Sequence, residues 1–166
     1  MTGSLNLSDA EEAELHRLMR RYHREAKRCQ TAKAYLAGCV MAAAVMEAAL
    51  ILMVSAFPEE AEATGKSSRK ELLRWDLGEL LNVAKAAGWL PAGLEIGKDD
   101  WLPRKAKVGD RAEVLRLIRD LLHPGRHTRE HLRQRVTKQY LEFALNVVFE
   151  VNDCLCERIA QAFTDR

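Results

Sequence analysis

The sequence has few of the residues that interrupt helices, with only 9 glycines and 4 prolines among 166 residues. A fold of many short strands and tight turns would need more of both. Apolar residues make up 48% of the chain, enough for a buried core, and charged residues make up 30%. Because 166 residues also suit one domain, we expect a single all-α domain over 1–166 and exclude a wholly disordered chain.

Common metal and nucleotide motifs are also missing. The four cysteines, Cys29, Cys39, Cys154 and Cys156, form no C-x-x-C pair. We therefore expect reduced thiols, a cytoplasmic location and no metal site. The chain has no P-loop, no G-x-G-x-x-G, no G-x-S-x-G and no H-E-x-x-H sequence. No cofactor is expected.

The longest apolar run could be either a membrane span or a core helix. Residues 1–9 are polar, with no basic segment before an apolar stretch, so no signal peptide is predicted. Tyr35–Phe57 is long enough to cross a bilayer. Glu47 at its centre and its many alanines disfavour insertion. We expect a buried core helix and no membrane, with a membrane-associated helix as the alternative.

Periodicity and capping residues divide the chain into about five helices in an up-and-down bundle. Ser8 or Asp9 can cap the first helix, Asp76 with Glu79 a short helix, and Asp110 the next one. The expected elements are a helical region over 8–57, loops plus the short helix Leu77–Ala87 over 58–109, a helix over 110–123, a basic turn, and a C-terminal helix over 136–163. Within 8–57 a first helix runs to about Arg28 and either ends there or continues, kinked near Gly38, into the apolar helix that ends near Phe57.

The helix over 110–123 carries what we call the polar strip: Arg116, Arg119, Asp120 and His123. These residues stand at i, i+3, i+4 and i+7 and share one helical face over two turns. Two guanidiniums and an imidazole suit a phosphate, because arginine binds its oxygens in a fork and histidine moves protons near neutral pH. A solvated face of an amphipathic helix explains the same pattern.

Glu47 offers a possible partner for this strip. It lies on a helix whose neighbouring positions are apolar, and a buried carboxylate needs a partner. We expect an ion pair with Arg116 or Arg119, which would turn the polar strip inward. The alternative is a protonated or water-bonded Glu47 at the edge of the bundle.

Basic residues are concentrated in two segments although the net charge is only +2. Residues 17–33 contain seven Lys or Arg against one acid, and residues 104–138 contain eleven against four. Such segments suit the backbone of RNA or DNA, or act as solubilising faces. Aromatic residues are scarce near them, which argues against a dedicated single-strand platform.

Three strings together resemble a known family. Leu117–Arg126 is similar to the Arg-Asn-Leu-Ile-His-Pro-Gly-Arg signature of small bacterial helical proteins, which in turn resemble the HEPN superfamily. The family also has a small-residue apolar helix, here Met46–Leu52, and a Leu-Gly-Glu-Leu helix followed by Gly and Pro, here Leu77–Leu81 and Gly88–Pro91. The likeness covers most of 34–130.

The resemblance implies a homodimeric bundle and a metal-independent ribonuclease site at the dimer interface. Active members carry an Arg and a His separated by four to six residues; six separate Arg116 from His123, and three separate Arg119 from His123. Asp120 replaces the family's Asn, and would either oppose a phosphate or hold an arginine in a salt bridge. We expect supporting roles for Glu47, Asp120 and Arg126.

The function expected from this resemblance is an RNA-cleaving enzyme of a toxin or defence system, with an antitoxin or another protein as partner. His123 would act as general base toward a ribose 2′-hydroxyl or as acid to the leaving oxygen. Arg116 and Arg119 would stabilise the charge that grows on the phosphate. The alternative is a non-catalytic interaction or nucleotide-sensing module, in which the Arg/His strip is structural.

Overall fold

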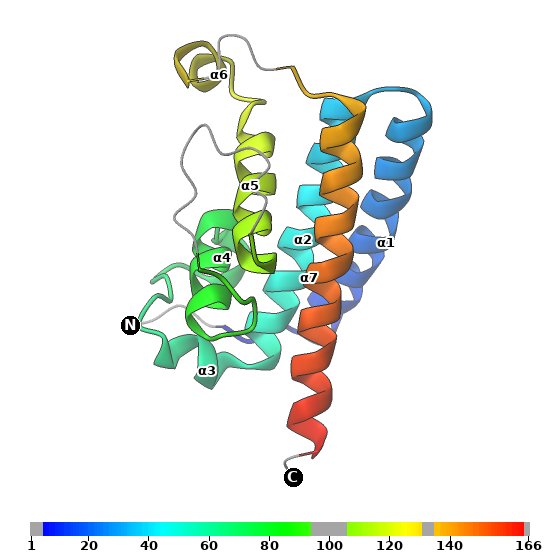
Figure 1. Ribbon diagram of the computed structural model, residues 1–166. Helices are drawn as coiled ribbons and strands as arrows, with labels where there is room; N and C mark the ends of the chain where they lie inside the picture. Colours follow the sequence, from blue (N-terminus) through cyan, green and yellow to red (C-terminus); the bar gives the residue numbers. More distant parts are fainter. Residues whose placement is uncertain (1–4, 94–105, 131–134, 165–166) are drawn as a thin grey trace.

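The computed structural model describes residues 5–93, 106–130 and 135–164. All regular elements within these ranges are helices and none is a strand, which confirms the all-α prediction (Figure 1). The elements are α1 (Asp9–Thr31), α2 (Tyr35–Ala56), α3 (Pro58–Ala63), the 3₁₀ helix η1 (Leu72–Arg74), α4 (Leu77–Ala86), α5 (Val108–Asp120), α6 (Pro124–Glu130) and α7 (Lys138–Thr164).

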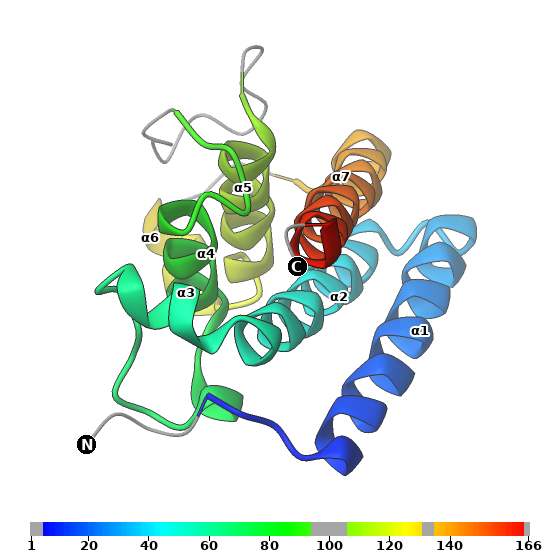
Figure 2. The same cartoon turned by 90° about the horizontal axis from the view of Figure 1, so that it is seen from below.

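The apolar helix α2 is the centre of the fold. It packs against α1, α4, α5 and α7, with α1 on one side and α4 and α5 on the other (Figure 2). Cys39, Leu50 and Val54 of this helix are fully buried. Since α2 supplies a surface to each neighbour, its apolar residues run all round the helix rather than along one stripe.

Among the described helices, α2 alone is long and apolar enough to cross a membrane. In its most apolar 18-residue stretch, 67% of the residues are buried inside the structure. Core helices pass the same test of length and composition, so the test leaves both interpretations of the apolar run in place.

The helical region expected over 8–57 is divided into two helices, so the alternative of one continuous or kinked helix is wrong. Two helices, α1 and α2, run antiparallel and are joined by a tight turn (Figure 1). Lys33 adopts a left-handed conformation, with φ 58°. The backbone N–H groups of Lys33 and Ala34 donate to the carbonyls of Gln30 and Cys29, which closes α1 with a Schellman motif. Glycine usually occupies the left-handed position of this motif, and its absence hid the turn.

Two of the predicted helix starts are confirmed. Ser8, rather than Asp9, caps α1 and forms a capping box with Glu11. The capping box of Asp76 and Glu79 opens α4 as predicted, and Gly88, with φ 77°, follows its end. The polar segment after α2 was expected to be a loop and instead begins with α3, where Pro58 occupies the first turn.

The helix that carries the polar strip also differs from its expected range of 110–123. It begins at Val108, so Asp110 lies in the first turn and is not the cap. The Asp110 carboxylate accepts hydrogen bonds from the backbone N–H groups of Lys107 and Gly93. α5 ends at Asp120, and Pro124 then starts α6 where only a basic turn was expected.

Trp89 ties the segment after α4 to the core. Its ring is buried, and its Nε1–H donates to Glu60 of α3 at 2.8 Å. Glu60 also pairs with Arg158 of α7, so one carboxylate links three parts of the chain. The four cysteines are free thiols, as the sequence predicts.

Gly38 marks a close approach of three helices and not a kink. A Cβ atom at Gly38 would lie 2.7 Å from Cδ2 of Leu141 on α7 and 3.2 Å from Cβ of Cys29 on α1. Leu141 is fully buried, so its side chain has little room to move away. The absence of a side chain at Gly38 is therefore what lets α1 and α7 pack against the start of α2.

We expect Gly38→Val to lower the free energy of unfolding by about 1–3 kcal/mol, because overpacking displaces Leu141. Ala37→Val places the same side chain at the adjacent, exposed position and should cost about 0.5 kcal/mol through helix propensity alone. Urea unfolding of both variants measures the difference. Equal stabilities for the two variants would contradict the close packing at Gly38.

Candidate functional site

The four residues of the polar strip line one pocket between α5 and the start of α4. Its volume is about 300 Å³. The lining residues are Asp76, Leu77, Gly78, Arg116, Arg119, Asp120 and His123. The strip therefore faces another element of the fold, and the interpretation as a fully solvated helix face is wrong.

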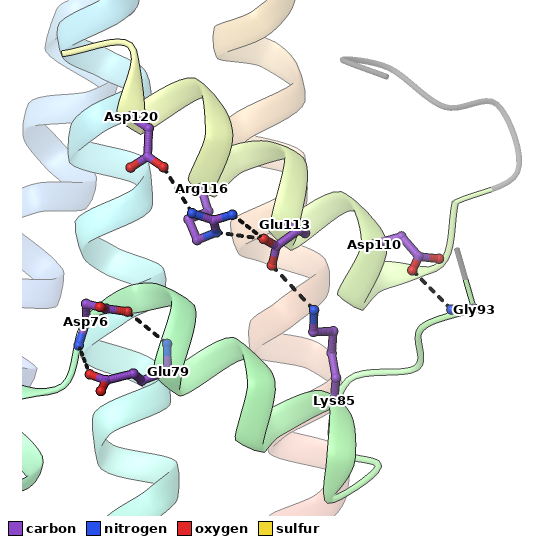
Figure 3. A network of polar contacts seen from close by, with 8 residues as sticks. All are labelled: Asp76, Glu79, Lys85, Gly93, Asp110, Glu113, Arg116 and Asp120. Carbon is purple, nitrogen blue, oxygen red and sulfur yellow. Dashed lines mark hydrogen bonds and ion pairs between the residues drawn. The ribbon is translucent and has the colours of Figure 1, made fainter. Parts of the chain in front are cut away.

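Arg116 is held on α5 by two carboxylates (Figure 3). Its Nε donates to Glu113 at 2.7 Å, and its Nη1 donates to Asp120 at 3.0 Å. Glu113 also lies 3.4 Å from Nζ of Lys85 on α4. Asp120 thus does what one of the two sequence alternatives proposed: it holds an arginine in a salt bridge. The Arg116 side chain is 23% exposed and lines the pocket.

Arg119 reaches the central helix. Its Nη1 lies 3.2 Å from Oε2 of Glu47, whose side chain is only 24% exposed. Burial raises the pKa of Glu47 above its ordinary value, the positive charge of Arg119 acts to lower it, and the negative charge of Asp76 adds to the rise. The expected ion pair of Glu47 is confirmed, and its partner is Arg119.

His123 lies beyond the regular part of α5. Its backbone N–H donates to the carbonyl of Asp120, three residues earlier, as the chain tightens before Pro124. The imidazole is exposed and makes no hydrogen bond or ion pair with the residues that the structure describes. It lines the pocket even though the helix expected to carry it ends at Asp120. The side chain of Arg126 is outside the described part, so its supporting role stays a prediction.

The start of α4 is a part of the site that sequence reasoning missed. Asp76 caps this helix, and Leu77 and Gly78 form its first turn beside Arg116. A Cβ atom at Gly78 would lie 3.1 Å from Oδ1 of Asp76 and 3.7 Å from Cδ of Arg116, so glycine keeps the pocket open. The capping box was visible in the sequence. This capping box could have indicated that the start of α4 belongs to the site, because helix N-termini attract anions.

The pocket combines groups that bind a phosphate with groups that repel one. Two guanidiniums and a helix N-terminus attract an anion, while the carboxylates of Asp76 and Asp120 oppose it. A guanidinium has five N–H donors, so the pairs with Glu113, Asp120 and Glu47 do not exhaust Arg116 and Arg119. Within the described ranges, no group of three or more His, Cys, Asp or Glu side chains is arranged to hold a metal ion.

Comparisons with known proteins identified no relative of this chain. No protein-family model, no curated protein and no solved structure matches the chain. The inferences about function therefore rest on the residues and their arrangement.

The raised pKa of Glu47 gives a testable dependence of stability on pH. The folded chain binds this proton more tightly than the unfolded chain, so ionisation of Glu47 lowers the free energy of unfolding as the pH rises through the raised pKa. Glu47→Gln removes that dependence. The free energy of unfolding of the wild type, minus that of Glu47→Gln, should increase as the pH falls from about 7 to about 4.

Urea unfolding at several pH values measures this difference. Glu142→Gln removes a carboxylate that is 48% exposed on α7 and controls for the loss of one surface charge. A stability difference between wild type and Glu47→Gln that stays constant over the pH range would show that burial does not perturb Glu47.

Proposed function

We propose that this chain is a HEPN-like, metal-independent ribonuclease whose active site is the pocket between α4 and α5. One observation carries the proposal: an accessible imidazole, His123, shares a pocket of about 300 Å³ with Arg116, Arg119 and the N-terminus of α4. An imidazole beside groups that attract a phosphate is the minimum set for cleaving RNA through its own 2′-hydroxyl.

The reaction uses one proton acceptor and a set of charges fixed in place. His123 takes the proton of the ribose 2′-hydroxyl, and the 2′-oxygen attacks the adjacent phosphorus. The bond from phosphorus to the 5′-oxygen breaks, and the leaving 5′-oxygen takes a proton from water. The products are a 2′,3′-cyclic phosphate and a 5′-hydroxyl. Arg116 and Arg119 stabilise the charge that develops on the non-bridging oxygens.

The carboxylates around the arginines act as positioning residues in this scheme. Glu113 and Asp120 fix the Arg116 guanidinium, and Glu47 fixes that of Arg119. A guanidinium held by a carboxylate loses less conformational freedom when it binds a phosphate. Its remaining N–H donors are thus oriented before the substrate arrives.

We expect His123→Ala to lower the rate of RNA cleavage about 10²- to 10⁴-fold, the usual contribution of a general base. The assay follows a labelled single-stranded RNA oligonucleotide in the presence of EDTA and identifies the cyclic phosphate product. The same oligonucleotide with 2′-deoxyribose should not be cleaved. The matched control is His16→Ala, which removes an exposed histidine on a different helix, α1.

Because His123 is exposed, its replacement should leave the thermal unfolding temperature unchanged. Cleavage that persists in purified His123→Ala, or that also proceeds on the deoxyribose oligonucleotide, would rule out the proposed chemistry. Roles in a toxin or defence system, an antitoxin partner and a cytoplasmic location remain predictions from the sequence.

A second function, a non-catalytic phosphate-binding module, is favoured by a separate observation. Both arginines already have carboxylate partners, and Asp76 and Asp120 also line the pocket. Such a site holds an anionic partner without a strong positive field to drive turnover. In that case the labelled RNA binds but stays intact, and its affinity falls in Arg119→Gln while it is retained in His123→Ala.

A further inference from the structure

A long groove lies on the opposite side of α2 from the pocket between α4 and α5. Helices α1 and α7 diverge from one another on the side of α2 away from α4 and α5 (Figure 2), and three hollows of about 490, 430 and 230 Å³ lie between them. The first two hollows share Met19 and Asn152, and the second and third share Ala56 and Ile159, so they form one continuous depression. We call it the α1/α7 groove.

Each of the three helices presents a row of residues to this groove with the spacing 4, 3, 4. The rows are Glu12, His16, Met19 and His23 on α1, Val45, Ala49, Leu52 and Ala56 on α2, and Asn152, Cys156, Ile159 and Phe163 on α7. This alternation is the heptad spacing with which helices pack along one another. Three such rows around one depression give it the side-chain spacing with which a further helix packs.

The row on α7 has large apolar side chains exposed to solvent. Phe163 is 76% exposed and Ile159 is 38% exposed. One heptad step before Cys156 the row continues to Phe149, which is 66% exposed. From Phe149 to Phe163 the row spans about 21 Å of helix. Aromatic residues exposed along one continuous stripe mark a surface that binds another protein.

Charges on the two sides of the groove are complementary. Arg20 and Arg24 of α1 line its basic end, and neither forms an ion pair with a described residue. On α7, Asp153 and Glu157 are exposed beside the apolar row and likewise form no ion pair within the described ranges. A helix that carries both an apolar heptad row and free acids would suit the groove, and α7 itself is such a helix.

We propose that the α1/α7 groove receives α7 of a second copy of this chain, so that two copies form a symmetric dimer. In a two-fold symmetric interface, both copies use the same surface. Each α7 then forms one wall of the groove in its own copy and occupies the groove of the other copy. The contact covers Phe149, Ile159 and Phe163 and brings acids of α7 near Arg20 and Arg24.

The position of this interface has a consequence for the pocket between α4 and α5. That pocket lies across α2 from the groove, so each copy holds a complete pocket and the two copies do not share one cleft. This differs from the shared site that the family resemblance implies. The proposed dimer does not rest on the ribonuclease proposal, and either can fail without the other.

Sedimentation velocity over a range of protein concentrations tests the proposal. The wild type should sediment as a dimer, and Phe149→Glu combined with Phe163→Glu should sediment as a monomer of the same helix content by circular dichroism. Both side chains are already largely exposed in the single chain, so their replacement should not unfold it. Arg20→Glu with Arg24→Glu should weaken the dimer at least tenfold.

Leu73→Glu is the matched control, because it places the same charge at an exposed apolar side chain on η1, away from the groove. This variant should remain a dimer. A monomeric wild type at about 100 μM, or a dimer that persists in the double phenylalanine variant, would overturn the proposal.

Cys156 supplies a measurement on the wild type without any substitution. Its thiol is exposed in the single chain and lies in the middle of the α7 row. Iodoacetamide should modify it slowly at concentrations that favour the dimer and faster on dilution, as read by mass spectrometry of the peptide. Modification at a rate independent of protein concentration would contradict an interface at this row.

Discussion

The ion pair between Glu47 and Arg119 connects the core of this protein to its candidate site. Glu47 is a carboxylate on the most apolar helix of the chain, and burial raises its pKa. Such a group is tolerated when a cation compensates for the water it has lost. Arg119 supplies that cation from α5, whose buried face consists of apolar residues such as Val114, Leu115 and Ile118. The pair therefore joins the core helix α2 to a residue that lines the pocket between α4 and α5.

The other arginine of the pocket, Arg116, also has carboxylate partners. Glu113 and Asp120 hold Arg116, and Lys85 joins Glu113 to α4. The network around Arg116 (Figure 3) orients its guanidinium but also reduces the positive potential available to a phosphate. The balance between these two effects distinguishes an enzyme, which needs charge stabilisation in the transition state, from a module that only binds.

The sequence carried enough information for the elements with strong local signals. The capping boxes at Ser8 and Asp76 and the apolar period of α7 depend on neighbours in the chain, so they could be predicted. The turn at Lys33 could not, because a lysine occupies a position where glycine is the usual signal. Gly78 was missed for another reason: its importance comes from Arg116, which is distant in sequence. The sequence left both Arg116 and Arg119 as partners of Glu47. Only the packing of α5 against α2 shows that the partner is Arg119.

The direct interaction between Glu47 and Arg119 links the core of the protein to the pocket between α4 and α5. A double-mutant cycle of Glu47→Gln and Arg119→Gln, measured as free energies of unfolding at neutral pH, tests it most directly. The account predicts a coupling energy of about 0.5–3 kcal/mol, with the double variant more stable than the sum of the single effects allows. Additive effects of the two substitutions would contradict it, because they would mean that the two side chains do not interact in solution.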